Sequence, residues 1–180
     1  MLLREWKELP DYMKNKEVRK YYLRLKKKEK SLILKRVFDV IMSSLMIVIA
    51  SPVLLAIAVW IKLDSEGPVF YRQERITQYG RSFKIHKFRT MVQNADKGYQ
   101  VTVNNDSRIT RVGKILRKLS LDELPQIFNI FMGQMSIIGP RPALWNQDDL
   151  YAERAKYGAN AVKPGLSGWA QINGRDELPI

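Results

Sequence analysis

The stretch that decides the fold is residues 40–61, which read VIMSSLMIVIASPVLLAIAVWI without one charged side chain. These 22 positions are close to the ~20 apolar residues that a helix needs to cross the hydrocarbon core of a bilayer. A charged stretch of more than thirty residues comes before it, and no small-residue cleavage site is present, so a removable signal peptide is not expected. The sequence therefore predicts a membrane-embedded helix.

Ser51 and Pro52 lie near the middle of this segment. A proline within a helix removes one backbone hydrogen bond and crowds the carbonyl four residues earlier, here that of Val48. In lipid the freed carbonyl needs a partner, for which the Ser51 hydroxyl, a neighbouring helix and shallow water are candidates. Ser51 and Pro52 are therefore predicted to break the membrane segment, by a kink or by a reversal of the chain.

Basic residues flank the apolar segment on both sides, and the positive-inside tendency draws both flanks toward the cytoplasm. A re-entrant hairpin satisfies both flanks, whereas a kinked span places the second cluster outside the cell. Re-entry is the preferred prediction, and the span stays open because prolines are tolerated in spanning helices. The flanking residues are Lys26, Lys27, Lys28, Lys30, Lys35 and Arg36 before the segment, and Lys62, Arg72, Arg75 and Arg81 after it.

The chain is strongly basic, with a formal net charge of +13 over 180 residues. Such a charge attracts nucleic acid, acidic lipid headgroups or phosphate-rich substrates. No recognised nucleic-acid motif is present, so anionic lipids and phosphates are the expected partners and nucleic acid is not. Cysteine is absent, which excludes disulfides, thiolate zinc sites and thiol nucleophiles.

The first 36 residues form a predicted basic helical arm. Its apolar positions have roughly helical spacing and form only a thin stripe: Tyr12, Val18, Tyr21, Tyr22 and Leu25. The arm is expected either to lie on anionic lipid or to be a solvated helix with a few aromatic contacts.

The part after the membrane segment is predicted to mix strands and helices. Residues 67–71 give a turn and a short strand. The alternation over residues 82–89, with Phe83 and Ile85 on one face and Lys84, Lys87 and Arg89 on the other, predicts the second strand of a hairpin. A helix with a cationic outer face is predicted over residues 108–119, and another over residues 127–135. The apolar face of the first comprises Ile109, Val112, Ile115, Leu116 and Leu119. Asn104, Asn105 and Asp106 mark a loop.

Two motifs in this part carry candidate chemistry, and each has a structural alternative. Residues 120–126 read SLDELPQ, in which Asp122 and Glu123 are adjacent carboxylates; Glu123 also stands where a capping box with Ser120 places its acid. Arg141 lies between two prolines, a rigid mount that suits paired donors to a phosphate, or else it is a turn residue with a surface salt bridge.

Two further segments are candidate ligand sites. Residues 163–175 contain three glycines, a proline and two cations, a composition typical of a tight loop whose backbone donors approach an anion. Asp148 and Asp149 are a possible metal pair, although the start of an exposed helix is the preferred interpretation.

Five ordered motifs together resemble the monotopic phosphoglycosyl transferases, the bacterial sugar transferase family, over about residues 32–180. They are KRVFD at 35–39 entering the proline-broken segment, KFRTM at 87–91, LDELPQ at 121–126, GPRP at 139–142 and the run 163–175. The resemblance implies a mainly helical α/β (α+β) fold, with a re-entrant membrane helix over 37–63 and a small catalytic part over 64–180. Residues 1–31 would be the separate basic arm.

The resemblance also implies a reaction: Mg²⁺-dependent transfer of a sugar 1-phosphate from a UDP-sugar to undecaprenyl (polyprenyl) phosphate, which initiates exopolysaccharide, capsule or glycoconjugate synthesis. The enzyme would lie on the inner leaflet of the cytoplasmic membrane, its catalytic part facing the cytoplasm, near anionic lipids and downstream glycosyltransferases. Asp122 would attack the β-phosphate and form a covalent phosphosugar intermediate, and Glu123, with Asp122, would hold Mg²⁺. Phosphate-binding roles are implied for Arg141, Arg117, Lys87 and Arg175.

The residue roles, the C-terminus and the function each have an alternative or an exception. Arg117 would otherwise pair with the acidic dyad, and Lys87 would otherwise be an exposed strand lysine. The family normally continues past the Asn-Gly-Arg run with an Asp before a Tyr, whereas this sequence stops at Ile180, so a truncated C-terminus is expected. The alternative function is an inactive membrane-associated scaffold of the same fold. No residue pattern names the sugar, the glycan pathway or the oligomeric state.

Overall fold

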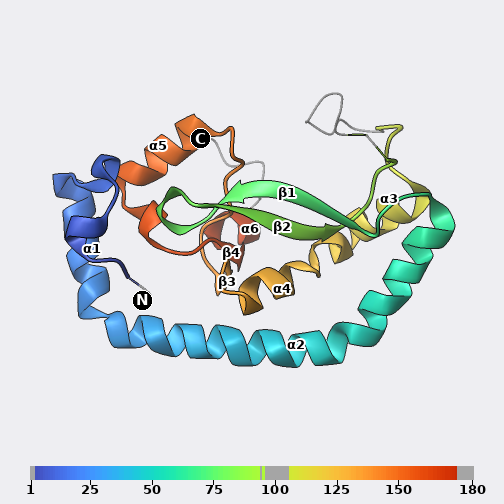
Figure 1. Cartoon of the computed structure of the whole chain (residues 1–180), viewed down its shortest axis with the longest axis horizontal. Helices are drawn as coiled ribbons and strands as arrows, with labels where there is room; N and C mark the ends of the chain where they lie inside the picture. The colour runs from blue at the N-terminus through green and yellow to red at the C-terminus, as the bar shows by residue number, and fades with distance from the viewer. Residues whose placement is uncertain (1–2, 94, 96–105, 174–180) are drawn as a thin grey trace. The chain divides into compact units, whose positions relative to one another are not determined.

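The computed structural model describes residues 3–93, 95 and 106–173. Within these residues the chain mixes helices and short strands and is mainly helical, as predicted (Figure 1). It divides into two compact units that are described separately. Unit 1 comprises residues 1–44, 74–84 and 129–180, and unit 2 comprises residues 45–73 and 85–128.

The longest element is helix α2, Glu29–Asp64, which contains Pro52 and continues through it. Among the described residues it is the one helix long and apolar enough to cross a membrane, and 17% of its most apolar stretch is buried in the protein. Such low burial is unlike that of a core helix. The Ser51 hydroxyl donates to the Val48 carbonyl at 2.8 Å, so the predicted partner for the carbonyl that Pro52 leaves free is confirmed.

The N-terminal arm belongs to the core of unit 1. Two short 3₁₀ turns, Trp6–Glu8 and Asp11–Met13, lead into helix α1, Lys16–Lys27, whose N-cap Asn15 accepts a hydrogen bond from the Val18 amide at 2.9 Å. The arm was expected to lie on lipid or to be a solvated helix with a few aromatic contacts. Val18 and Tyr22 of its apolar stripe are buried in the protein, whereas Tyr12 is 47% exposed and contacts the ring of Tyr151. The buried cluster comprises Leu3, Leu9, Met13, Val18, Tyr22, Tyr79 and Ala161.

The predicted hairpin is present. Strand β1, Phe70–Ile76, pairs with strand β2, Ser82–Phe88, and the connection includes Tyr79 with a φ of 62°. Phe83 and Ile85 are buried while Lys84 is exposed, as the alternation predicted. Arg89, expected on the outer face, is instead 6% exposed. Its guanidinium donates to the Ser65 carbonyl at 2.7 Å and so caps the C-terminal end of α2.

Unit 2 is built around the second half of α2 and helix α3, Arg111–Lys118. Thr110 caps α3 by accepting a hydrogen bond from the Gly113 amide at 2.9 Å. The helix is shorter than predicted, and Ile115 and Leu119 of its expected apolar face are exposed. The buried cluster of this unit comprises Ile57, Ile61, Phe88, Val112 and Leu116.

The remainder of unit 1 surrounds a small parallel sheet. Strand β3, Ser136–Ile138, pairs with β4, Gly165–Ser167, in the register Ser136↔Gly165 and Ile138↔Ser167. A Cβ on Gly165 would lie 2.1 Å from the Gly139 amide nitrogen, so the close approach of the two chains requires glycine there. The other elements are the 3₁₀ turn Ala159–Ala161 and helices α4, Gln126–Phe131, α5, Asp148–Lys156, and α6, Trp169–Ile172.

Candidate functional site

The acidic pair lies on a 3₁₀ turn, Leu121–Glu123, between α3 and α4. Ser120, which precedes the turn, has a φ of 55°, and its side chain makes no cap hydrogen bond. The capping-box alternative for Glu123 is therefore wrong. A left-handed residue followed by a tight turn bends the chain sharply, and Asp122 and Glu123 are presented at that bend, each partly exposed.

Lys87 contacts this turn from strand β2. Its ammonium lies 2.9 Å from Oε1 of Glu123, and the two side chains are 20% and 21% exposed. Lys87 is therefore not an exposed strand lysine. A partly buried pair of this kind is screened by solvent less than a surface pair, so its field also acts on neighbouring groups.

Asp122 has an unusual environment for a carboxylate. Burial raises the pKa of Asp122 above its ordinary value, and the neighbouring charge of Glu123 raises it further, while Lys87 and Arg117 oppose both effects. The same burial leaves the ionised carboxylate poorly solvated and thus more reactive toward an electrophile. Perturbed carboxylates of this kind cluster at functional sites.

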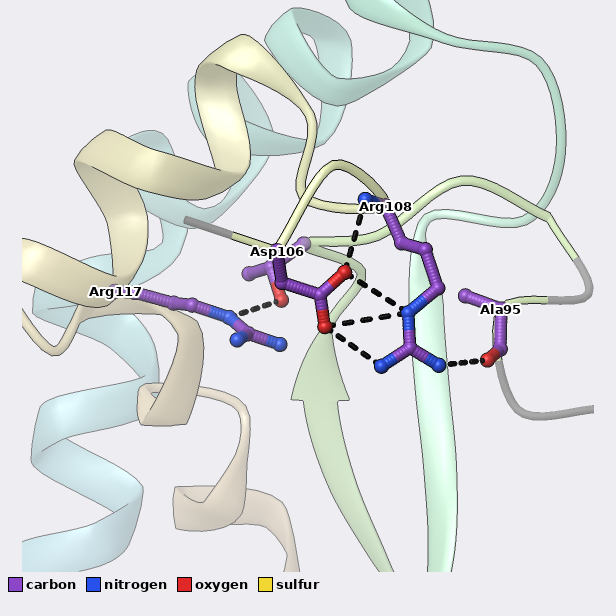
Figure 2. A network of polar contacts seen from close by, with 5 residues as sticks. Ala95, Asp106, Arg108 and Arg117 are labelled. Carbon is purple, nitrogen blue, oxygen red and sulfur yellow. Dashed lines mark hydrogen bonds and ion pairs between the residues drawn. The ribbon is translucent and has the colours of Figure 1, made fainter. Parts of the chain in front are cut away.

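Arg117 of α3 is positioned by the chain beside it. Its Nε donates to the Thr90 hydroxyl at 2.8 Å, and Asp106 lies close to its guanidinium (Figure 2). The Arg117 charge lowers the pKa of both Asp122 and Asp106. Lys87, Arg117, Asp122 and Glu123, four of the predicted site residues, thus come together in unit 2.

Asp106 and Arg108 form a local clamp that the sequence interpretation did not identify. The Asp106 carboxylate accepts hydrogen bonds from Nε of Arg108 at 2.9 Å and from its Nη2 at 2.6 Å (Figure 2). The side-chain hydrogen bonds from Arg108 are the main cause that lowers the pKa of Asp106 to about 2. The Asp-x-Arg spacing was visible, but only the fold brings it beside Arg117.

Arg141 belongs to unit 1, in the loop after β3. The Gly165 amide donates to the Pro140 carbonyl at 2.9 Å, and the Arg154 guanidinium donates to the Arg141 carbonyl at 2.6 Å, so this loop is held on both sides. Within the described residues the Arg141 guanidinium makes no ion pair, and both the phosphate role and the salt-bridge alternative stay predictions. Arg175 lies outside the described residues.

The described part of run 163–175 is not a free anion-binding loop. Residues 165–167 form β4, and the amide of Gly165 is already bonded to Pro140. Asp148 and Asp149 are exposed in the first turn of α5, the preferred interpretation. Across the described ranges no three His, Cys, Asp or Glu side chains gather as a metal site.

Mg²⁺ remains compatible with the acidic pair. This ion usually takes one or two carboxylates from a protein and completes its shell with water and substrate phosphates. Asp122 and Glu123 supply two adjacent carboxylates, and water and the oxygens of a substrate diphosphate would complete the coordination shell. Glu123 would have to share its carboxylate with Lys87, or exchange it, when the ion binds.

Residues 35–39, the first of the five motifs, have a structural role in unit 1. The Asp39 carboxylate accepts hydrogen bonds from the Ser136 hydroxyl at 2.8 Å and from the Ile137 amide at 3.1 Å. The Arg36 guanidinium donates to the carbonyls of Ile130 and Phe131 at 2.7 and 2.8 Å. This motif therefore ties the start of α2 to β3 and to the end of α4.

Comparison with known proteins identifies the family. The family model for bacterial sugar transferases matches residues 30–180. The chain belongs to the bacterial sugar transferase family. This membership confirms the resemblance drawn from the five motifs.

Curated relatives of this bacterial sugar transferase carry related names. It is 47% identical over 148 residues, 80% of this chain and 32% of the relative, to a UDP-glucose:undecaprenyl-phosphate glucose-1-phosphate transferase of Klebsiella pneumoniae. It is 45% identical over 142 residues, 77% and 34%, to a UDP-N-acetylgalactosamine-undecaprenyl-phosphate N-acetylgalactosaminephosphotransferase of Aeromonas hydrophila. It is 41% identical over 160 residues, 80% and 70%, to the exopolysaccharide production protein ExoY of Rhizobium meliloti. The chain spans about a third of the length of the first two.

Proposed function

We propose that the protein transfers a sugar 1-phosphate from a UDP-sugar to undecaprenyl phosphate and so initiates the synthesis of an exopolysaccharide or related glycan. The observation that carries the proposal is the acidic turn, where Asp122 with a raised pKa lies beside the Lys87–Glu123 pair and Arg117. The names of relatives at 45–47% identity support the substrate classes.

The chemistry is proposed to proceed in two displacements. The Asp122 carboxylate attacks the β-phosphorus of the UDP-sugar, the bond to the α-phosphate oxygen breaks, and UMP leaves with that oxygen. A phosphate oxygen of undecaprenyl phosphate then attacks the same phosphorus, releasing the Asp122 carboxylate and forming a polyprenyl diphosphate sugar. Two steps allow a soluble substrate and a lipid substrate to occupy the site in turn.

The cationic side chains have roles in charge neutralisation. Two like charges, a carboxylate and a diphosphate, must approach each other in the first step, and Lys87 and Arg117 reduce their repulsion. Glu123 and Asp122 would hold Mg²⁺, which would act as a Lewis acid toward the diphosphate. Arg141 and Arg175 are proposed to bind substrate phosphate through paired donors.

The membrane part of the proposal concerns α2. Its apolar segment is proposed to enter the inner leaflet of the cytoplasmic membrane and return, with Ser51 and Pro52 at the break, so that both basic flanks lie in the cytoplasm. The Ser51–Val48 hydrogen bond is compatible with this insertion, because it satisfies the carbonyl that a proline leaves free in lipid whether the helix returns or spans; the basic residues on both flanks are what favour re-entry. Reporter labelling that places Arg72 outside the cell would contradict re-entry.

The test of the reaction is UMP release. Detergent-solubilised protein is incubated with Mg²⁺, undecaprenyl phosphate and a panel of UDP-sugars, including UDP-glucose and UDP-N-acetylgalactosamine. Repeated release, beyond about one UMP per protein molecule, that requires the lipid is expected, and Asp122→Asn should abolish all release. An absence of release with every sugar, or unchanged release from Asp122→Asn, would contradict the proposal. Trapping a phosphosugar on Asp122 without the lipid acceptor tests the intermediate.

A further inference from the structure

Unit 1 contains a cavity of about 190 Å³ beside the first half of α2. It lies between residues 32–39 of the helix, the loop after β3 and residues 161–163, immediately before the charge-free segment begins at Val40. Its walls combine apolar and cationic side chains, including Leu32, Ile138, Val162, Lys35, Arg36 and Lys163. A matching ligand would have both an apolar part and an anionic group.

One acidic side chain, Asp39, lines this cavity with the three cations. Its carboxylate is 4% exposed and already accepts hydrogen bonds from Ser136 and Ile137. The ammonium of Lys35 lies 3.6 Å from it and also contacts the Ser136 hydroxyl. Asp39 therefore compensates Lys35, and two of the three cations are left without a carboxylate from the cavity wall.

Arg36 and Lys163 differ in how they are used. The Arg36 guanidinium is bonded to the carbonyls at the end of α4. Lys163 makes no ion pair within the described residues, although it is only partly exposed. Burial lowers the pKa of Lys163, and the nearby charge of Arg36 lowers it further. The charge of Asp39 raises this pKa, but by less than Arg36 lowers it. A cation in such a place gains stability when an anion enters.

We propose that this cavity binds the phosphate group of a membrane lipid, with Lys163 as its principal cationic contact and the apolar wall against the adjoining part of the lipid. The position favours a lipid over a free phosphate, because the cavity lies at the start of the apolar segment, where headgroups would be if that segment is embedded. The inference rests on the membrane insertion proposed above, and does not depend on the transfer reaction.

The phosphate can come from two kinds of lipid, an anionic phospholipid or the isoprenoid phosphate carrier. The full chain in a neutral detergent is titrated with phosphatidylglycerol, undecaprenyl phosphate, phosphatidylcholine and inorganic phosphate, and bound lipid is measured by native mass spectrometry. The wild-type protein should retain one of the first two lipids in preference to phosphatidylcholine. Whichever of these two lipids binds more tightly is the source of the phosphate group.

The variants decide whether the cavity is responsible. Lys163→Gln should weaken retention of that lipid about fivefold, the effect of one surface cation on an anionic headgroup. Lys163→Arg should keep it, and so should Lys84→Gln, which removes an exposed lysine of β2. Unchanged retention in Lys163→Gln, equal loss in Lys84→Gln, or equal retention of phosphatidylcholine would overturn the proposal. Thermal melting of each variant shows that it is folded.

The measurement is separate from catalysis. It uses no UDP-sugar and is repeated in Asp122→Asn, which should bind the lipid as the wild-type protein does. Lys163-dependent retention in a protein that releases no UMP would support the lipid site and contradict the proposed reaction. UMP release from a protein whose lipid retention does not depend on Lys163 would support the reaction and contradict the lipid site.

Discussion

The ammonium of Lys87 lies 2.9 Å from Oε1 of Glu123, and the neighbouring Asp122 is the carboxylate whose pKa burial raises. One cation thus neutralises one acid directly and lowers the pKa of the other from further away. The two adjacent acids are thereby given different properties, Glu123 paired and Asp122 poorly solvated. Acids whose environments separate them in this way usually have separate chemical roles.

Asp122→Asn should raise thermal stability at neutral pH while it abolishes turnover. The pKa of Asp122 is raised in the folded state, so its contribution to stability is fully present below the unfolded pKa and is lost as the pH rises through the folded pKa. Asparagine does not ionise and avoids that loss. Melting curves with Mg²⁺ removed should show a higher Tm for the variant at pH 7, and a smaller difference at pH 4. A lower Tm at pH 7 would contradict the burial argument.

The pH dependence of turnover should report the same group. The attacking carboxylate must be ionised, so kcat/KM should rise with pH through a pKa above the ordinary aspartate value. Lys87→Gln removes a charge that lowers the pKa of Asp122, so the acid limb should move to higher pH as activity falls. Lys84→Gln, on the same strand but exposed, is the matched control and should leave the limb in place.

The sequence predicted those features that depend on neighbouring residues. The apolar helix, its Ser51 partner at Val48, the hairpin and the helix before the acidic turn follow from periodicity and local hydrogen bonding. The four residues of the acidic turn, chosen through motifs, also lie together in the fold. Each of these signals is contained within a few consecutive residues.

The missed features depend on contacts between distant segments. Val18 and Tyr22 are buried because Tyr79 and Ala161 cover them, and no local pattern signals that contact. Arg89 was expected to be exposed from alternation, but the carbonyls at the end of α2 attract its guanidinium inward. Asp106 was assigned to a loop from its polar neighbours, and its proximity to Arg117 arises only in the fold.

Glu123→Gln should raise the Mg²⁺ concentration needed for half-maximal turnover by at least roughly tenfold. The amide keeps the size of the side chain but removes the anionic ligand and the partner of Lys87. Asp149→Asn, an exposed acid of α5, is the control and should leave the requirement unchanged. An unchanged requirement in Glu123→Gln would contradict its proposed role as a metal ligand.

Thr90→Val should lower kcat about tenfold and leave KM for the UDP-sugar nearly unchanged. Its hydroxyl accepts the hydrogen bond that orients Arg117, and small errors in the position of a charged group are costly in the transition state. Thr90→Ser keeps the hydroxyl and should keep most of the rate. Equal losses in both variants would point to packing around Thr90, not to the orientation of Arg117.

Asp39→Asn should destabilise the protein by about 1–3 kcal/mol, because the carboxylate is buried and its oxygens accept hydrogen bonds from Ser136 and Ile137. In asparagine an NH₂ group replaces one carboxylate oxygen, so it faces either the Ser136 hydroxyl or the Ile137 amide as a second donor. The negative charge that neutralises Lys35 is also lost. Asp148→Asn, in the exposed first turn of α5, should cost less than about 1 kcal/mol. Chemical unfolding of both variants measures the difference, and equal stabilities would show that Asp39 does not hold α2 to β3. A loss confined to Asp39→Asn would establish that this first motif supports the fold, leaving the acidic turn to carry the chemistry.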